Sequence, residues 1–200
     1  MHTSSVDKMR AFIDKYLAPK KNESLLIMDI GSQEVHVNGS YKPLFQEYTN
    51  WTYRGVDMVA GNNVDIVLND IYNWSQIPSN SVDVIISGQA FEHIEYFWLS
   101  MMEIARVLKP GGICCIIAPS SGYEHRYPVD CWRFYPDGFR ALAKSAHLSP
   151  VEAYTQWEDS DAYDEGTNCW HDSVLIARKD RSFGLRDTLR RFLIQLSRKL

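Results

Sequence analysis

Short, nearly continuous apolar runs alternate along this chain with more polar stretches. Five such runs indicate β-strands, at residues 25–29, 53–59, 64–68, 82–87 and 112–118. A strand without polar alternation is typical of a parallel sheet that is covered on both faces. Each run ends in acidic, amide, glycine or serine residues, and ligands of open α/β sheets bind at that carboxyl edge. Two further runs, 151–156 and 173–178, are expected to complete the sheet.

Three segments have the apolar spacing of an amphipathic helix. The first begins near Ser4 or Ser5, either of which is expected to cap it, and ends at Pro19. The second spans 96–108, and the third spans 137–147 with Asp137 as its expected cap. Between the last two strands, residues 157–168 hold five acidic side chains. That segment is expected to be a loop near the mouth of the site, or simply a solvated acidic loop.

Two acidic residues stand where predicted strands end. Asp29 closes the first strand and is followed by Gly31, while Asp57 closes the second strand, 26 residues after Gly31. A glycine turn lets backbone N–H groups approach a ligand, and an acid at the second strand end accepts hydrogen bonds from ribose hydroxyls. The pattern therefore indicates a nucleoside site. An Asp-x-Gly turn also occurs as an ordinary exit from a strand, and that alternative stays open on these residues alone.

A longer set of segments resembles one known family. These are DIGS at 29–32, GVD at 55–57, ND at 69–70, SVDVIISGQAFEHI at 81–94 and EIARVLKPGGICCIIAPS at 103–120. Over about residues 25–179 the chain resembles a class I S-adenosylmethionine-dependent methyltransferase of the methyltransferase domain type 11 family. PVDCWRFYPDGFRAL at 128–142 is similar to a bacterial subgroup of that family. The resemblance implies a Rossmann-like, doubly wound α/β fold: a seven-stranded, mostly parallel sheet with helices on both faces and an antiparallel last strand.

Two features depart from the family pattern. The glycine-rich loop is reduced to Gly31 and a distant Gly39. Only residues 58–63 separate Asp57 from the third strand, which leaves no room for the helix that relatives have there. A loop is therefore expected beside the cofactor, and the adenine contacts are the part of the site that this departure affects most.

The resemblance implies S-adenosylmethionine as the cofactor and S-adenosylhomocysteine as the product. The methionine end is expected at the first strand end, the ribose on Asp57, and the adenine beside Met58 and Asp70. The expected cofactor-binding residues are Asp29, Gly31, Ser32, Gln33, Asp57, Met58, Asp70, Ile71, Ser87, Gly88 and Gln89.

Methyl transfer from a sulfonium requires alignment and exclusion of water, and a hydroxyl acceptor must also lose its proton. His93 and His125 follow the fourth and fifth strands, so both are expected at the carboxyl edge. Either is a candidate general base, because imidazole titrates near neutral pH. Asp130 is expected to orient a histidine or to bind a substrate hydroxyl. The alternatives are ordinary packing for the histidines and turn capping for Asp130, while Glu92 is expected to be solvated or structural.

No metal site is expected, because His125, Asp130 and His171 match no standard ligand spacing. The four cysteines include the adjacent Cys114 and Cys115 and form no Cys-x-x-Cys motif, which favours a reducing, cytoplasmic environment. The N-terminus has no apolar stretch typical of a signal peptide, and no apolar run approaches the roughly 20 residues that span a bilayer.

Charge divides the chain of 200 residues into two parts. Residues 181–200 carry six basic side chains and one acid, a net charge of +5; since the whole chain carries −4, residues 1–180 carry −9. We expect a methyltransferase domain over 1–180 and a basic amphipathic helix over 181–200. The acidic body argues against a nucleic-acid substrate.

The expected acceptor is a small molecule or a glycan precursor, with oxygen preferred to nitrogen because histidine bases are at hand. One alternative is a cofactor-binding regulatory or interaction module without turnover, which the reduced glycine loop suggests. The other is a protein or RNA methyltransferase, and the negative body speaks against RNA.

The C-terminal segment places its apolar residues on one helical stripe: Leu185, Leu189, Phe192, Leu193, Leu196 and Leu200. A basic amphipathic helix can lie on an anionic membrane surface or dock on a partner. It can equally pack on the acidic body of its own chain or on a second subunit, and the opposite charges favour that alternative.

Overall fold

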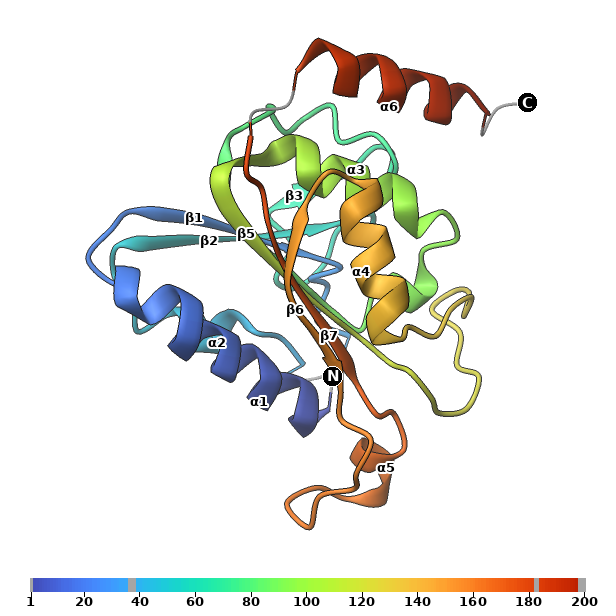
Figure 1. The fold of residues 1–200 in the computed structure, drawn as a ribbon. Helices are drawn as coiled ribbons and strands as arrows, with labels where there is room; N and C mark the ends of the chain where they lie inside the picture. The colour runs from blue at the N-terminus through green and yellow to red at the C-terminus, as the bar shows by residue number, and fades with distance from the viewer. Residues whose placement is uncertain (1, 36–38, 182–183, 198–200) are drawn as a thin grey trace.

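The computed structural model describes residues 2–35, 39–181 and 184–197, and it contains a seven-stranded sheet with helices on both faces (Figure 1). The strands are β1 Leu25–Ile30, β2 Trp51–Asp57, β3 Ile66–Val67, β4 Val82–Gly88, β5 Leu108–Ala118, β6 Ser149–Thr155 and β7 Ser173–Arg178. Their order across the sheet is β3-β2-β1-β4-β5-β7-β6. Strands β1 to β5 are parallel, while β7 runs antiparallel to both β5 and β6. This confirms the predicted doubly wound sheet with an antiparallel last strand.

The helices are α1 Thr3–Phe12, α2 Lys42–Phe45, α3 Phe97–Val107, α4 Pro136–Ser145, α5 Glu165–Asn168 and α6 Leu185–Ser197. Helices α1 and α2 cover one face of the sheet, and α3 and α4 cover the other (Figure 1). Helix α1 continues into a π-helical turn and a 3₁₀ turn, so its regular α-helical part ends at Phe12, well before Pro19.

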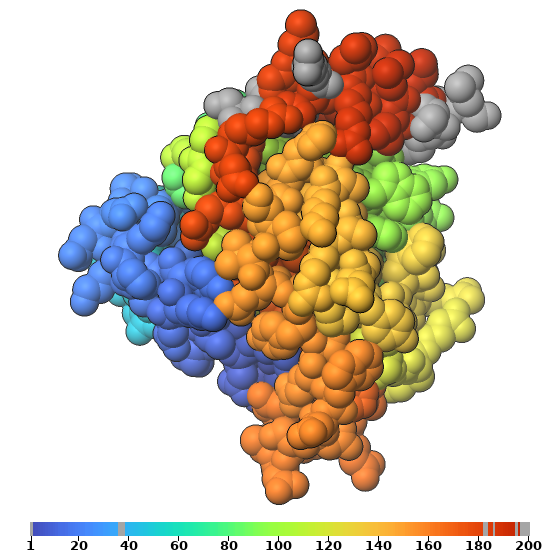
Figure 2. All heavy atoms as spheres, viewed as in Figure 1, coloured from blue at the N-terminus to red at the C-terminus, as the bar shows by residue number. Residues whose placement is uncertain are grey.

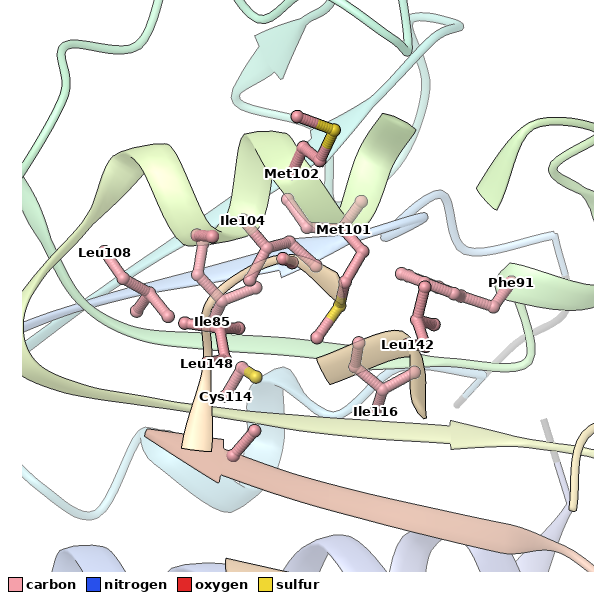
Figure 3. Close-up of a cluster of buried hydrophobic side chains, with 14 of the residues drawn as sticks. Ile85, Phe91, Met101, Met102, Ile104, Leu108, Cys114, Ile116, Leu142 and Leu148 are labelled. Atoms are coloured by element: carbon pink, nitrogen blue, oxygen red, sulfur yellow. The ribbon is translucent and has the colours of Figure 1, made fainter. Parts of the chain in front are cut away.

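Two hydrophobic clusters pack on the two faces of the sheet. Neighbouring residues of β4 enter different clusters: Ile85 joins the side of α3 and α4 (Figure 3), whereas Val84 and Ile86 join the side of α1. In β5, Cys114 and Cys115 divide in the same way, and both are fully buried, free thiols. Because both faces of the sheet are covered, each central strand is a continuous apolar run instead of an alternating one.

The predicted cap of the first helix was wrong. Ser4 and Ser5 lie inside α1, whose N-cap is His2. The Ser4 hydroxyl donates to the carboxylate of Asp172 at 2.8 Å, and the hydroxyls of Ser5 and Tyr41 share a hydrogen bond of 2.6 Å. Both serine hydroxyls therefore tie α1 to the body of the fold.

The predicted cap of the third helix was also wrong. Helix α4 begins at Pro136 with Tyr135 as its N-cap, since proline suits the first helical turn, where its missing N–H costs nothing. Asp137 instead pairs with Arg140 on the surface. The acidic segment 157–168 is a loop for most of its length and ends in the short helix α5.

Helix α6 lies on the body at the end of the molecule near α3 (Figures 1 and 2). Two of its arginines and Ile194 contact the body, while most of its predicted apolar stripe is exposed. Arg191 pairs with Glu103 of α3, and Arg190 donates to the backbone carbonyl of Ser145 at 2.6 Å. The exposed stripe consists of Leu185, Leu189, Phe192, Leu193 and Leu196. Leu200 lies outside the described residues. Among the residues that are described, no helix has the length and apolar character needed to cross a membrane.

Deleting residues 181–200 is expected to lower the melting temperature by about 2–4 °C, because the Arg191–Glu103 contact is worth on the order of 1 kcal/mol. The matched control is the double variant Leu189→Ser and Phe192→Ser, which changes two exposed side chains and should melt like the parent. Light scattering measures the molecular mass of each variant, and vesicle flotation measures its binding to membranes. Loss of flotation on deletion, with the mass and the melting temperature unchanged, would contradict docking on the body and favour a membrane surface.

Candidate functional site

The turn after β1 lies at the carboxyl edge of the sheet, between the ends of β2 and β4. Asp29 is buried there, and it accepts a hydrogen bond from the Tyr53 hydroxyl at 2.5 Å. Burial raises the pKa of Asp29 to about 7. Gly31 has φ +77°, and a Cβ at this position would lie 2.4 Å from the Cβ of Ala90. Glycine therefore lets the β1 turn pack directly against the loop that follows β4. The neighbouring Ser32 is buried, and its hydroxyl donates to a backbone carbonyl of the loop after β2 at 2.9 Å.

Asp57, at the end of β2, organises two turns through backbone N–H groups. One carboxylate oxygen accepts from Gln33 at 3.0 Å. The other accepts from Met58 at 2.7 Å and from Val59 at 3.2 Å. The structure thus brings the end of β2, the turn after β1 and the exposed Met58 together, and it confirms that a loop follows β2 in place of a helix.

The loop after β3 holds two more of the predicted residues. A carboxylate oxygen of Asp70 accepts from the N–H of Tyr72 at 2.8 Å. The carbonyl of Ile71 accepts from the indole of Trp74 at 2.8 Å and from the hydroxyl of Ser100 in α3 at 3.0 Å. The loop is therefore anchored to α3, and its half-buried Asp70 and Ile71 follow the strand next to Asp57.

The end of β4 is shaped mainly by packing. The Ser87 hydroxyl donates to the last carbonyl of β1 at 2.8 Å, so it serves the sheet. A Cβ on Gly88 would lie 1.8 Å from the hydroxyl oxygen of Tyr41, which leaves room for glycine only. Gln89 has φ +58°, and its side-chain amide donates to Asp172 at 3.0 Å. The predicted residues of this strand end thus lie beside the β1 turn, with their side chains engaged in the protein.

His93 and His125 lie together beyond the ends of β4 and β5, with ring centroids 4.8 Å apart. His93 closes a 3₁₀ turn, Phe91–His93, and its Nδ1 lies 2.5 Å from the carbonyl oxygen of Val129. Because a carbonyl oxygen only accepts, Nδ1 holds the proton and Nε2 presents a lone pair. Burial lowers the pKa of His93, which favours this neutral form of the ring.

Asp130 connects His125 to Arg133. It accepts the backbone N–H of His125 at 2.8 Å, and the same oxygen lies 3.4 Å from Nδ1 of that ring. Arg133 donates to both carboxylate oxygens, at 2.6 and 2.9 Å. These hydrogen bonds hold the pKa of Asp130 well below its usual range. The structure therefore brings the three predicted catalytic residues into one cluster and adds Arg133, which the sequence had not singled out.

Glu92 is not solvated, contrary to one of the two expectations for it. Its exposed fraction is 0%, and neither carboxylate oxygen has a hydrogen-bond partner among the described residues. One oxygen lies 3.7 Å from Nε2 of His93. Burial raises the pKa of Glu92 to about 8. Nothing local in the sequence signals this burial. The loop after β5 contacts this turn, because the backbone N–H groups of Cys131 and Trp132 donate to the Glu92 carbonyl.

Three residues of this cluster could hold a metal ion: Glu92, His93 and His125 each offer one donor atom, and these atoms lie within 4.8 Å of one another. His171, which the sequence analysis had considered as a ligand, is not among them. Its Nε2 lies 3.9 Å from a carboxylate oxygen of Asp159 in the acidic segment.

One family model matches the part of the chain that carries the ends of β1 to β4. Residues 25–116, from β1 into β5, match the model of the methyltransferase domain family. The match covers just under half of the chain, and within it the chain is similar to a methyltransferase domain.

Solved structures share the fold of this chain at low sequence identity. The YcgJ protein from Bacillus subtilis is 14% identical, with a TM-score of 0.64, over 90% of this chain and 100% of that chain. A 1,6-didemethyltoxoflavin-N1-methyltransferase from Burkholderia thailandensis, solved with 1,6-didemethyltoxoflavin and S-adenosylhomocysteine, is 17% identical, with a TM-score of 0.61, over 89% and 85%. An S-adenosylmethionine-dependent methyltransferase from Archaeoglobus fulgidus is 15% identical, with a TM-score of 0.61, over 88% and 95%. A search of curated protein sequences finds no match to this chain.

Proposed function

We propose that the protein transfers the methyl group of S-adenosylmethionine to an oxygen, or to a nitrogen, of a small molecule or glycan precursor. The observation that supports this most is the cluster of His93, His125 and Asp130, which follows β4 and β5 at the same sheet edge as the turns of Asp29 and Asp57. A proton acceptor thus lies at the edge where a cofactor binds in open α/β sheets. Such an arrangement suits a hydroxyl acceptor, which must lose its proton at the moment of attack.

The cofactor is assigned to the turns at the strand ends. Asp57 is the proposed ribose ligand: its carboxylate has about four acceptor positions, and three backbone N–H groups use three of them. One position therefore remains for a ribose hydroxyl. The methionine end is placed near Asp29, Gly31 and Gln33, beside the end of β4, and the adenine beside Met58, Asp70 and Ile71.

The chemical step requires little from the protein beyond alignment, exclusion of water and removal of one proton. His125, or its neighbour His93, takes the acceptor proton, while Asp130 holds the backbone of His125 through its N–H and stabilises the imidazolium by its charge. Aromatic side chains from the same loop, Tyr123 and Tyr127, lie close to the His125 ring and are exposed. Their faces suit a sugar or a planar ring, which supports a small acceptor.

Turnover with a panel of hydroxyl and amine acceptors, measured beside cofactor binding, tests the proposed function. Methyl transfer to a hydroxyl compound that outpaces transfer to the matched amine is the expected result. Cofactor binding without transfer to any acceptor, protein or RNA in the panel would favour the alternative of a regulatory module.

Replacing Asp57 by alanine is expected to weaken S-adenosylmethionine binding by roughly 2–3 kcal/mol, because a charge-assisted acceptor for the ribose is lost. Calorimetry measures the change. Asp65→Ala is the matched control, since Asp65 also accepts a backbone N–H, that of Gly55 at 2.8 Å, but is not assigned to the cofactor. Equal losses in the two variants, or an unchanged affinity in Asp57→Ala, would contradict the ribose assignment.

A further inference from the structure

The buried carboxylate of Glu92 lacks the partners that a buried charge requires. Its exposed fraction is 0%, and neither of its oxygens has a hydrogen-bond partner among the described residues. Burying an isolated carboxylate without such partners costs several kcal/mol, so it binds a proton or a cation instead. The side chains that surround Glu92 indicate whether the carboxylate binds a proton or a cation.

His93 presents a lone pair to this carboxylate. Its Nδ1 lies 2.5 Å from the carbonyl oxygen of Val129 and must donate there, which leaves Nε2 as an acceptor 3.7 Å from an oxygen of Glu92. Two acceptor atoms thus face each other at a distance too long for a hydrogen bond between them. A histidine that ligates a metal typically donates its other ring N–H to a backbone carbonyl in this way.

His125 completes the group from the loop that follows β5. Its Nδ1 lies 3.4 Å from a carboxylate oxygen of Asp130, which Arg133 holds through two hydrogen bonds. This Nδ1 makes no hydrogen bond to any described residue, but it faces the Asp130 carboxylate, the kind of group that orients metal-binding histidines. Each of the three side chains offers a donor atom within 4.8 Å of the other two, although their positions are 92, 93 and 125 in the sequence.

We propose that Glu92, His93 and His125 bind a divalent transition-metal ion, with Zn²⁺ as the best match. Two imidazoles and one carboxylate form the donor set of open zinc sites, in which the fourth position is left for water or substrate. In a tetrahedral site with metal–ligand distances near 2 Å, ligand atoms lie about 3.3 Å apart. The donors must therefore close in by up to about 1.5 Å, and the loop that carries His125 is the element proposed to supply this movement.

This site replaces the expectation that no metal binds, which rested on ligand spacing along the chain. It does not depend on methyl transfer, because binding of the ion is measured without cofactor or acceptor. In the metal-free enzyme an imidazole takes the acceptor proton. With the ion bound, both imidazoles would be ligands, and an acceptor hydroxyl in the open position would lose its proton to solvent, helped by the charge of the metal, as water does at open zinc sites.

Calorimetric titration of the metal-stripped, full-length protein with ZnCl₂ tests the proposal. Cys131 and Cys169 are changed to serine beforehand, since both thiols are at least partly exposed and bind zinc themselves. The parent should bind one equivalent of Zn²⁺. Glu92→Gln, which keeps the shape and removes the charge, should weaken binding about 100-fold or more, and His125→Ala should do the same. His171→Ala is the control and should bind like the parent.

Failure of the parent to bind Zn²⁺ would overturn the proposal and leave Glu92 as a buried, protonated acid. Equal affinity in the parent and in His125→Ala would overturn it as well, by showing that the ion sits elsewhere. His125 is the more exposed member of the group, so this variant decides the question if Glu92→Gln does not fold.

Discussion

Replacing His125 by alanine is expected to lower kcat by ~10²–10⁴-fold and to leave S-adenosylmethionine affinity nearly unchanged. The imidazole lies beyond the end of β5, next to His93, whereas the cofactor is assigned to the turns after β1, β2 and β3. Removing the ring therefore removes the proposed proton acceptor without touching those turns. Part of the lost activity should return at high pH, where the acceptor hydroxyl ionises without help.

His93→Ala is expected to give a loss of the same kind, and His147→Ala is the matched control. His147 lies in the turn between α4 and β6, beside Arg190 of α6, and its replacement should leave kcat unchanged. Steady-state kinetics over a pH series, with cofactor affinity from calorimetry, separates the variants. If both His125→Ala and His93→Ala retain full activity at neutral pH, alignment alone accounts for the transfer and the histidine role is wrong.

Replacing Glu103 by alanine is expected to destabilise the fold by about 3–5 kcal/mol, because it leaves a buried arginine unpaired. Glu103 is fully buried in α3 and accepts hydrogen bonds from Arg106 at 2.8 and 3.1 Å. It also accepts the backbone N–H of Trp74 at 2.8 Å and pairs with Arg191 of α6. Four donors on α3, α6 and the loop after β3 thus lose their acceptor together.

Urea unfolding of Glu103→Ala beside Glu103→Gln measures this loss. Gln keeps an acceptor oxygen and removes the charge, so it should fall between the parent and the alanine variant. Asp137→Ala is the control for an exposed ion pair, the one with Arg140, and should change the free energy of unfolding by less than about 0.5 kcal/mol. If Glu103→Ala lowers the free energy of unfolding by less than about 1 kcal/mol, Arg106 is solvated or paired again in the variant. Glu103 would then contribute far less to stability than expected.

The sheet was predictable because burial on both faces requires apolar residues at nearly every position of a strand, and such runs can be recognised in the sequence. Residues 82–87 and 112–118 are continuous apolar runs, and the structure has β4 and β5 there. The antiparallel last strand came from the family resemblance, since periodicity does not report strand direction. The carboxyl-edge positions of Asp29, Asp57 and His93 followed from strand direction in a parallel sheet.

The features that sequence reasoning missed depend on contacts between distant segments. Serine is a common helix cap, but Ser5 lies inside α1, and its hydroxyl forms a hydrogen bond with the hydroxyl of Tyr41. Glu92 is a charged residue within a 3₁₀ turn, and its full burial involves the distant loop after β5, which contacts that turn. The apolar stripe predicted for residues 181–200 is exposed where α6 is described, and Glu103 of α3, which pairs with Arg191, helps to set which face of α6 contacts the body.

A crystal structure of the full-length protein with S-adenosylhomocysteine tests the central claim most directly. The account predicts the homocysteine end beside Asp29 and Gly31, a ribose hydroxyl hydrogen-bonded to Asp57, and the sulfur facing the side of His93 and His125. S-adenosylhomocysteine bound away from the carboxyl ends of β1, β2 and β4, or with its sulfur turned from the histidine cluster, would contradict both the cofactor assignment and the proposed chemistry.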